Sequence, residues 1–208
     1  MRRVTEAAYW ASVEIARDKG VFPLFDRDRY PAAPFVHALP AGLQAAIAQH
    51  GIRNSHLTAI APAGTISLLA GNVSSGIEPV YALSYVRRVR QPDGTIAGVP
   101  VECRALAEFA RLHGSADPLP ESFVTLGDIG PGAQLEMQAA LQPHVDNAIA
   151  KTVNVPADIP FAEFAAIYRR AYALGLKGCT VYRPNAVTGA VLSAAPTAER
   201  CCDLPGAD

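Results

Sequence analysis

The sequence has little excess charge of either sign, since 18 basic and 19 acidic side chains give 208 residues a net charge of -1. A nucleic-acid-binding surface usually needs a basic excess on one face, so neither DNA nor RNA is an expected partner. No uncharged apolar run reaches the length of about 18 residues that suggests a membrane-spanning helix. No apolar segment of the kind found in signal peptides follows the start at residues 1–4. These absences predict a cytoplasmic protein without a membrane partner.

Cysteine and histidine are also sparse, and their spacing does not suit a metal. No two cysteines form a CxxC pair, and no histidine lies three or four residues from another. We therefore expect no metal site, and a reducing compartment rather than a disulfide framework. The residues concerned are Cys103, Cys179, Cys201 and Cys202, and His37, His50, His56, His113 and His144.

Half of the residues are hydrophobic, which is enough to form one domain with a sizeable core. Their periodicity alternates between that of helices and that of strands, and this order predicts an α/β fold. Helices are expected over 4–19, 41–50, 101–113, 132–150 (divided at Pro143) and 161–174. Strands are expected over 57–60, 80–89, 152–155 and 178–183. Helices are expected to end at Gly20, Gly51, Gly114 and Gly175, and a turn is expected over 91–94. In the first helix, the apolar face is predicted to consist of Val4, Ala7, Ala8, Ala11, Ile15 and Ala16.

The composition changes near Leu192, where Ser, Ala, Pro and Thr become frequent. Segments of this kind at the end of a chain are commonly loose. The sequence therefore predicts one domain over residues 1–192 and a flexible tail over 193–208.

A short loop between a predicted strand and a predicted helix is the best candidate for a binding site. Small residues let several backbone N–H groups point the same way, and such groups at a helix start bind anions. The loop lacks the GxxxxGK[ST] pattern of a Walker motif. From spacing alone, ordinary helix capping by a Gly-Thr turn remains the alternative. The candidate phosphate-binding residues are Ala63, Gly64, Thr65, Ile66 and Ser67.

Several blocks of sequence, in order along the chain, resemble the C-terminal part of the catalytic chain of ribonucleotide reductases. The similarity is greatest to the adenosylcobalamin-dependent, or class II, branch. The blocks are 51–56 (GIRNSH), 61–67 (APAGTIS), 72–79 (NVSSGIEP), 144–149 (HVDNAI), 151–156 (KTVNVP) and 175–185 (GLKGCTVYRPN).

This resemblance implies a fold and an activity. The fold is the C-terminal portion of a ten-stranded α/β barrel. The activity is that of a vitamin B12-dependent ribonucleoside-diphosphate reductase, which converts ribonucleotides to deoxyribonucleotides with adenosylcobalamin as the cofactor of the complete enzyme. In this family the loop that matches residues 63–67 grips the substrate phosphates, mainly through backbone N–H groups. Ala63 stands where Thr or Ser is usual, which removes one hydroxyl contact and leaves the backbone donors in place.

The family's radical chemistry needs a loop with the pattern Asn-x-Cys-x-Glu, which this sequence does not contain. Cys103 lies in a helical pattern with the wrong neighbours, and we interpret Cys103 and Cys179 as buried structural thiols. We therefore expect no catalytic residue here, and a fragment or split subunit that is inactive alone. Its expected partner is a second chain that carries the preceding barrel strands, or another copy of itself. The alternative is a non-catalytic nucleotide-binding remnant or regulatory module.

Cys201 and Cys202 lie where class II chains often carry a mobile cysteine pair that re-reduces the active site. The resemblance therefore suggests a redox tail. The family pair is normally spaced, whereas these two cysteines are adjacent, so an incidental pair remains the alternative.

Overall fold

The computed structural model describes residues 1–71, 73, 75–184 and 192–194. Contacts between residues divide the chain into two compact units. The first unit consists of Met1–Pro62, Gly132–Val153 and Pro160–Thr180. The second consists of Ala63–Pro131, Asn154–Ile159 and Val181–Asp208. Each unit is described separately below.

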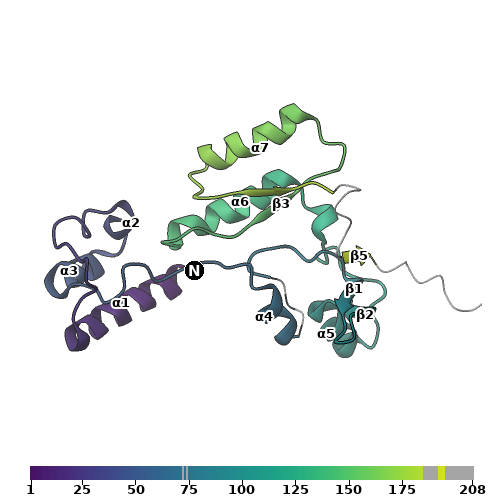
Figure 1. Ribbon diagram of the computed structural model, residues 1–208, viewed down its shortest axis with the longest axis horizontal. Helices are drawn as coiled ribbons and strands as arrows, with labels where there is room; N and C mark the ends of the chain where they lie inside the picture. The colour runs from purple at the N-terminus through teal and green to yellow at the C-terminus, as the bar shows by residue number, and fades with distance from the viewer. Residues whose placement is uncertain (72, 74, 185–191, 195–208) are drawn as a thin grey trace, which may run out of the picture. The chain divides into compact units, whose positions relative to one another are not determined.

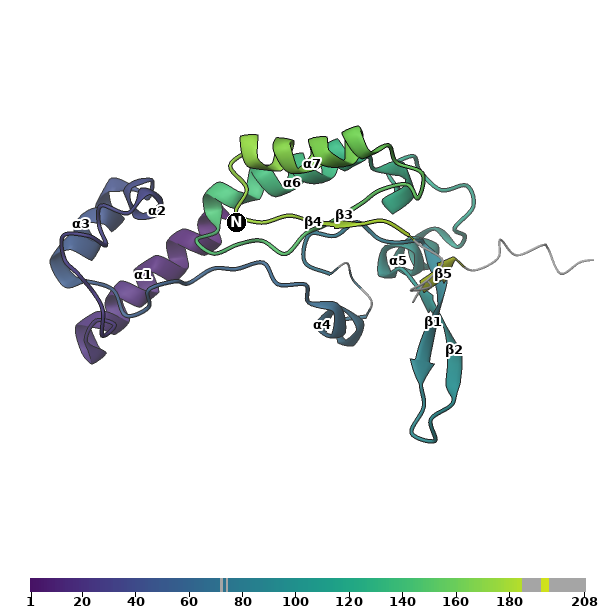
Figure 2. The same cartoon turned by 45° about the horizontal axis from the view of Figure 1, so that its top comes forward.

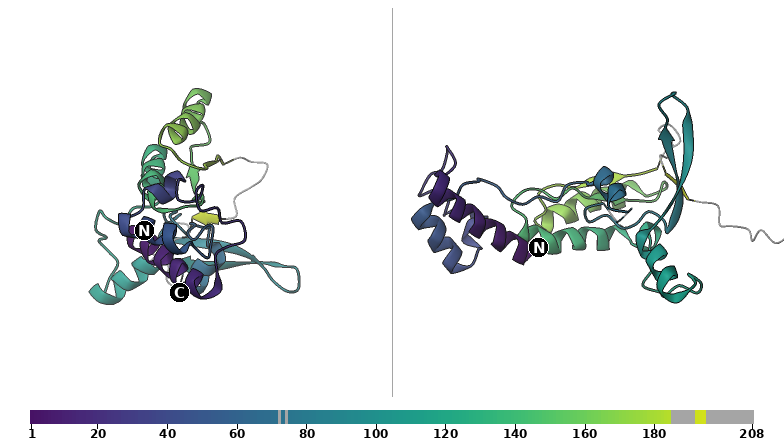
Figure 3. Two further views of the ribbon diagram at one scale, coloured as in Figure 1. Left: turned by 90° about the vertical axis from the view of Figure 1, so that its left-hand side faces the viewer. Right: turned by 90° about the horizontal axis from the view of Figure 1, so that it is seen from below.

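Three helices form the apolar core of the first unit: α1 (Arg2–Lys19), α2 (Pro34–His37) and α3 (Ala41–His50). α1 and α3 pack against each other (Figure 3). Both end at the predicted glycines, because Gly20 and Gly51 adopt positive φ angles of 78° and 75° that side-chain-bearing residues rarely adopt. The buried residues of this core are Tyr9, Val13, Val36, Leu39, Leu43, Ile47 and Ile52.

The face that α1 buries is not the face predicted from its sequence. The buried residues are Thr5, Tyr9, Ser12, Val13 and Ala16, so Ala16 alone belongs to both sets. On the predicted face, Val4 is 60% exposed and Ile15 is 41% exposed. The prediction left out two apolar residues that are buried, Tyr9 and Val13. It also left out Thr5 and Ser12, whose hydroxyls bond to His144 O and the Asn54 side chain.

Two short parallel strands span the unit boundaries at Val153 and Thr180. β3 (Thr152–Asn154) pairs with β4 (Thr180–Tyr182), and the N–H of Thr180 donates to the carbonyl of Lys151. Parallel neighbours need a crossover connection, which α7 (Phe161–Ala173) provides. α6 (Pro131–Leu141) and α7 lie along these strands (Figures 1 and 2).

Two predictions in this region were wrong in extent. The helix expected over 132–150 ends at Leu141 and continues only as a 3-10 turn, η2 (Gln142–His144), which contains Pro143. Residues 145–150 are not helical, because Ile149 forms an isolated parallel bridge with Ile60. That bridge is also all that the structure contains of the strand expected over 57–60.

The second unit contains α4 (Gly64–Leu69), a β-hairpin and α5 (Arg104–His113). The hairpin strands β1 (Ser84–Arg90) and β2 (Ile96–Glu102) are antiparallel, and the predicted turn over 91–94 joins them (Figure 2). A 3-10 turn, η1 (Leu126–Asp128), follows α5. The helix expected over 101–113 begins only at Arg104, because Val101 and Glu102 pair with β1.

A third strand, β5 (Leu192–Ala194), pairs with β1 on the side opposite β2. Residues 193 and 194, which the sequence assigned to the tail, are therefore in a strand. In the described part of the chain, the strands form this three-stranded sheet and the β3–β4 pair, not a closed barrel. The mixture of helices and strands confirms the α/β prediction at that level. No described helix is long and apolar enough to cross a membrane.

Candidate phosphate-binding site

The predicted phosphate loop is the start of α4 in the second unit. Ala63 caps the helix in the left-handed region, with φ of 50°, and Gly64 begins the first turn. The N–H of Ser67 is used inside the helix, since it donates to the carbonyl of Ala63 at 2.8 Å. Among the described residues, nothing accepts a hydrogen bond from the N–H of Gly64, Thr65 or Ile66. The turn therefore presents three backbone donors at an exposed helix start.

The left-handed conformation of Ala63 is unusual for a residue with a side chain and costs roughly 1–2 kcal/mol. A left-handed residue next to a right-handed one turns successive N–H groups to the same side, which forms a concave anion-binding nest. Gly64 adds room, because a Cβ built on it would meet no atom within 4 Å. The nest geometry and the open space both favour close approach of an anion to these donors.

The two hydroxyls of the loop differ in what they can do. Ser67 is buried, and its hydroxyl donates to the carbonyl of Gly64 at 2.7 Å and lies 3.3 Å from Ser75 Oγ. This bond stabilises the turn and uses the only proton of the hydroxyl. Thr65 is exposed, and no described residue is bonded to its hydroxyl. As the structure stands, an anion would meet three amides and one hydroxyl.

In the first unit, Asp146 fixes the segment that leads toward this loop. Its carboxylate accepts hydrogen bonds from the N–H groups of Leu57 and Thr58, at 2.6 and 2.9 Å, and from the hydroxyl of Thr58 at 3.1 Å. The hydroxyl of Tyr9 donates to the same carboxylate at 2.8 Å. Leu57 and Thr58 lie a few residues before Pro62, the last residue of the segment. Asp146 thereby ties α1, residues 57–58 and the turn after η2 together.

The environment of this network keeps Asp146 ionised. Burial alone would raise the pKa of Asp146, but the bonds from the Leu57 and Thr58 amides, Tyr9 and the Thr58 hydroxyl outweigh burial and lower it. Burial, together with Tyr30 and Asp146, raises the pKa of Tyr9. Asp146 is thus an acceptor and Tyr9 a donor at neutral pH. Sequence reasoning placed Asp146 only within a matching block and gave it no role.

A second buried polar cluster was also missed. Gln134, Gln138 and Gln142 are spaced four residues apart and are nearly fully buried, at 2%, 0% and 6% exposure. Gln134 accepts a hydrogen bond at 3.0 Å from Lys151, which is also buried. The amides of Gln138 and Gln142 donate to backbone carbonyls and so hold residues 145–151 in place. Their acceptors are Ile149 and Gly178 for Gln138, and Val145 and Asn147 for Gln142. The spacing of four residues between these glutamines was the feature of the sequence that could have indicated the cluster.

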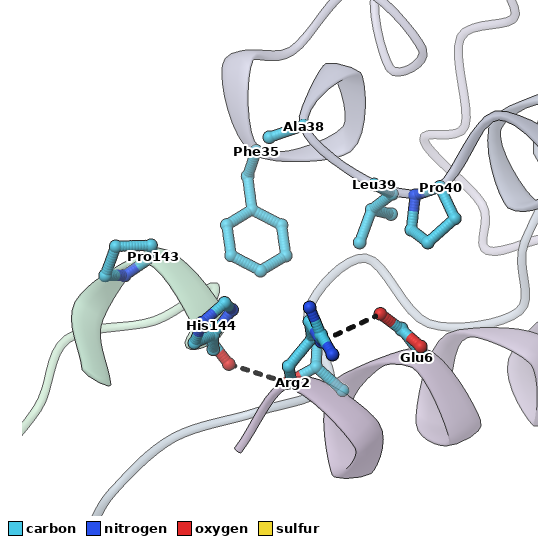
Figure 4. A pocket seen from close by; sticks show the side chains of 9 residues that line it. Arg2, Glu6, Phe35, Ala38, Leu39, Pro40, Pro143 and His144 are labelled. Carbon is cyan, nitrogen blue, oxygen red and sulfur yellow. Dashed lines mark hydrogen bonds and ion pairs between the residues drawn. The ribbon is translucent and has the colours of Figure 1, made fainter. Parts of the chain in front are cut away.

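A cavity of about 350 Å³ lies in the first unit, at the start of α1 (Figure 4). Its charged side chains are Arg2 and Glu6, which form an ion pair at 3.8 Å. Because Glu6 compensates the charge of Arg2, this ion pair gives an anion no excess positive charge. The lining residues are Arg2, Thr5, Glu6, Phe35, Ala38, Leu39, Pro40, Pro143 and His144.

Two of the four cysteines, Cys103 and Cys179, lie within the described residues. Cys103 is 6% exposed at the start of α5, which confirms that it is buried but not that it lies within a helix. Cys179 is only partly buried; burial raises the pKa of its thiol, and nearby Lys151 opposes that effect. Cys201 and Cys202 lie outside the described residues. Across the described residues, no three His, Cys, Asp or Glu side chains are placed to hold a metal ion.

Comparison with known proteins agrees with the matching blocks. The family model "Ribonucleotide reductase, barrel domain" matches residues 1–182. This chain belongs to the ribonucleotide reductase barrel-domain family. The match confirms the resemblance to the C-terminal part of a class II catalytic chain.

Curated members of the ribonucleotide reductase family are considerably longer than this chain. The "Vitamin B12-dependent ribonucleoside-diphosphate reductase" of Mycobacterium tuberculosis (strain CDC 1551 / Oshkosh) is 35% identical over 94% of the chain and 28% of its own length. The protein of the same name from Thermoplasma acidophilum is 32% identical over 93% of the chain and 25% of its own length. A "Vitamin B12-dependent ribonucleotide reductase" from Streptomyces clavuligerus is 30% identical over 70% of the chain and 18% of its own length.

Proposed function

We propose that this chain supplies the substrate-phosphate loop of a vitamin B12-dependent ribonucleoside-diphosphate reductase. The observation that carries the proposal is the set of three donors at Gly64, Thr65 and Ile66, which no described residue uses. Hydrogen bonds from N–H groups to a charged phosphate are about twice as strong as those between neutral groups. The start of a helix adds a favourable electrostatic term for an anion. The ligand proposed for the loop is a ribonucleoside diphosphate.

The contribution of the loop to the reaction is positioning. Holding the diphosphate at a fixed point limits where the ribose can lie relative to the reacting groups, and such orientation supplies a large part of enzymatic rate enhancement. In the complete enzyme, adenosylcobalamin supplies the radical that starts the chemistry. No residue of this chain is assigned to the cofactor.

We further propose that the chain does not turn over alone. It contains no Asn-x-Cys-x-Glu pattern, and Cys103 is buried at a helix start. The missing groups would come from a second chain that carries the part of the relatives not covered here. Exposed aromatic side chains on α7 support such a partner, since Phe161 is 82% and Tyr172 is 87% exposed.

Calorimetry tests binding by the loop directly. The chain should bind a ribonucleoside diphosphate without cobalamin, and the matching nucleoside should bind at least tenfold more weakly, since it offers no charge to the N–H groups. Equal binding of the two would remove the support for a phosphate site. Incubating the chain with labelled ribonucleotide, adenosylcobalamin and a dithiol should yield no deoxyribonucleotide, and product from the pure chain would refute the need for a partner.

A non-catalytic nucleotide-binding module is the second candidate. It is favoured by the combination of an accessible donor set at residues 64–66 with the lack of the radical-cysteine pattern. Both candidates predict phosphate-dependent binding. They differ when a chain carrying the missing part of the family is added, because only the reductase subunit should then support deoxyribonucleotide formation.

A further inference from the structure

Two glutamines, in the last turn of α6 and at the start of η2, each bury a side-chain oxygen that has no donor among the described residues. Gln138 is 0% exposed and Gln142 is 6% exposed. The Oε1 atom of each is buried, and no described residue donates a hydrogen bond to it. Nearly all buried polar atoms in folded proteins have a protein or water partner, because an unpaired acceptor loses its hydration without replacement. Each oxygen therefore needs a donor that the described residues do not supply.

The direction in which each oxygen points is fixed by the other half of the same amide. The NH2 group of Gln138 donates to two backbone carbonyls, at 2.8 and 3.4 Å. The NH2 group of Gln142 also donates to two backbone carbonyls, at 3.0 and 3.1 Å. Turning either amide round would bring its oxygen against two carbonyl oxygens and break both hydrogen bonds. Both unpaired atoms are therefore acceptors.

Gln134, four residues before Gln138, shows how such an acceptor is satisfied by the protein itself. Its Oε1 accepts a hydrogen bond at 3.0 Å from Lys151, which is also buried. Within the described chain, neither Lys151 nor any other donor reaches the Oε1 atoms of Gln138 and Gln142. The row of buried glutamines thus has one acceptor paired by the protein and two that are not.

The ligand that fits these two atoms is small, neutral and able to donate twice. A metal ion does not fit, because Ca²⁺ and Mg²⁺ take about six or more oxygen ligands, whereas two oxygens are unpaired here. Residues four apart on a helix lie on the same side, with Cβ atoms about 5–6 Å apart. Water donates two hydrogen bonds, and internal waters make roughly two to four in total. One water molecule between Gln138 and Gln142 supplies both missing donors.

We propose that Gln138 and Gln142 bind one internal water molecule, which donates one hydrogen to each Oε1. Through their NH2 groups the same side chains hold the carbonyls of residues 145–149. The water thereby completes the hydrogen bonding of a buried polar layer that supports this segment. The inference depends on residues of the first unit alone and does not require nucleotide binding.

NMR of the unmodified chain tests for the bound water. Cross-peaks from the water resonance to the side-chain NH2 protons of Gln138 and Gln142 should have opposite signs in NOESY and ROESY spectra. That pattern marks water that stays in place while the protein tumbles. Gln49, which is exposed on α3, should give no cross-peaks of this kind. Absence of the effect at either buried glutamine would overturn the proposal.

Removing one glutamine tests whether the water is shared. Gln142→Met should also abolish the water cross-peaks at Gln138, because the water loses one of its two acceptors. Gln49→Met makes the same change at an exposed position and should leave those cross-peaks intact. Circular dichroism checks that each variant retains its helices. Persistence of the Gln138 signal in folded Gln142→Met would contradict a shared water.

A crystal structure of the unmodified chain provides the same test without a substitution, in case Gln142→Met does not fold. The expected water lies about 2.5–3.0 Å from both Oε1 atoms. Two separate waters, or a protein donor at either oxygen, would overturn the proposal.

Discussion

The hydroxyl of Tyr9 donates a hydrogen bond to the carboxylate of Asp146 across 137 residues of sequence, at 2.8 Å. The same carboxylate accepts from the N–H of Leu57 and Thr58. One ionised side chain therefore connects the first helix, the segment that precedes the candidate phosphate loop, and the turn that follows η2.

Replacing Asp146 should destabilise the fold strongly. Asp146→Asn turns one acceptor oxygen into an amide that faces N–H and O–H donors, which leaves buried donors unpaired. We expect the free energy of unfolding to fall by about 3 kcal/mol, as measured by urea denaturation. Asp158→Asn is the matched control, because Asp158 is exposed and has no hydrogen-bond partner among the described residues, and it should change stability little. Equal losses for both variants would contradict the role given to Asp146.

The Asp146 network should also make the free energy of unfolding depend on pH in the acid range. Its folded-state pKa lies below the ordinary value of about 3.9, so its contribution is fully present above that pH and is lost as the pH falls through the folded-state pKa. The difference in stability between the unmodified chain and Asp146→Asn should therefore be constant near neutrality and shrink in acid. Denaturation at several pH values measures it, and a difference that grows in acid would reverse the assigned sign.

Gly64→Ala should weaken nucleotide binding without destabilising the fold. No atom lies within 4 Å of the added Cβ, and alanine is the better helix former, so the variant should be at least as stable as the unmodified chain. The methyl group would stand in the open space next to the N–H donors, and we expect nucleoside diphosphate binding to weaken by about tenfold, or 1.4 kcal/mol. Gly130→Ala, which also meets no atom within 4 Å, should bind normally in calorimetry. Unchanged affinity in Gly64→Ala would place the ligand elsewhere.

A substitution at Ala63 is expected to raise the affinity for the diphosphate rather than lower it. Ala63→Ser adds a hydroxyl beside the donors, and one neutral hydrogen bond contributes about 0.5–1.5 kcal/mol, so we expect diphosphate affinity to rise roughly threefold. Ala63→Gly keeps every N–H group and suits the φ of 50°, so it should alter affinity less than twofold, within about 0.4 kcal/mol. Titration calorimetry on the three chains compares them, and weaker binding by the serine variant would contradict this account of the loop.

Helix ends marked by glycine could be predicted from the sequence because their cause is local. Gly20, Gly51 and Gly114 all stop helices at positive φ, and the turn over 91–94 joins two strands as expected. The buried face of α1 could not be predicted, since Thr5 and Ser12 are buried only because His144 and Asn54 supply partners far along the chain. The same holds for residues 145–150, whose helical spacing is overridden by pairing with residue 60.

Some features of the candidate site could likewise be predicted from the sequence, and others could not. The loop and helix start at residues 63–67 were predicted and are present, and the binding role of the five residues remains a prediction. The hydroxyl of Ser67 donates to the carbonyl of Gly64, and no sequence pattern predicts that hydrogen bond. Asp146 could not be given a role from sequence, because its partners at Tyr9, Leu57 and Thr58 are brought to it only by the fold.

The most direct test of the central claim is a backbone amide NMR titration with a ribonucleoside diphosphate and, separately, with its nucleoside. The diphosphate should shift the amide signals of Gly64, Thr65 and Ile66, and the nucleoside should not. The amides of Gly94 and Gly114, in two other turns, should stay in place with both. Signals at residues 64–66 that do not move with saturating diphosphate, or that move equally with the nucleoside, would contradict a phosphate-binding role for this loop.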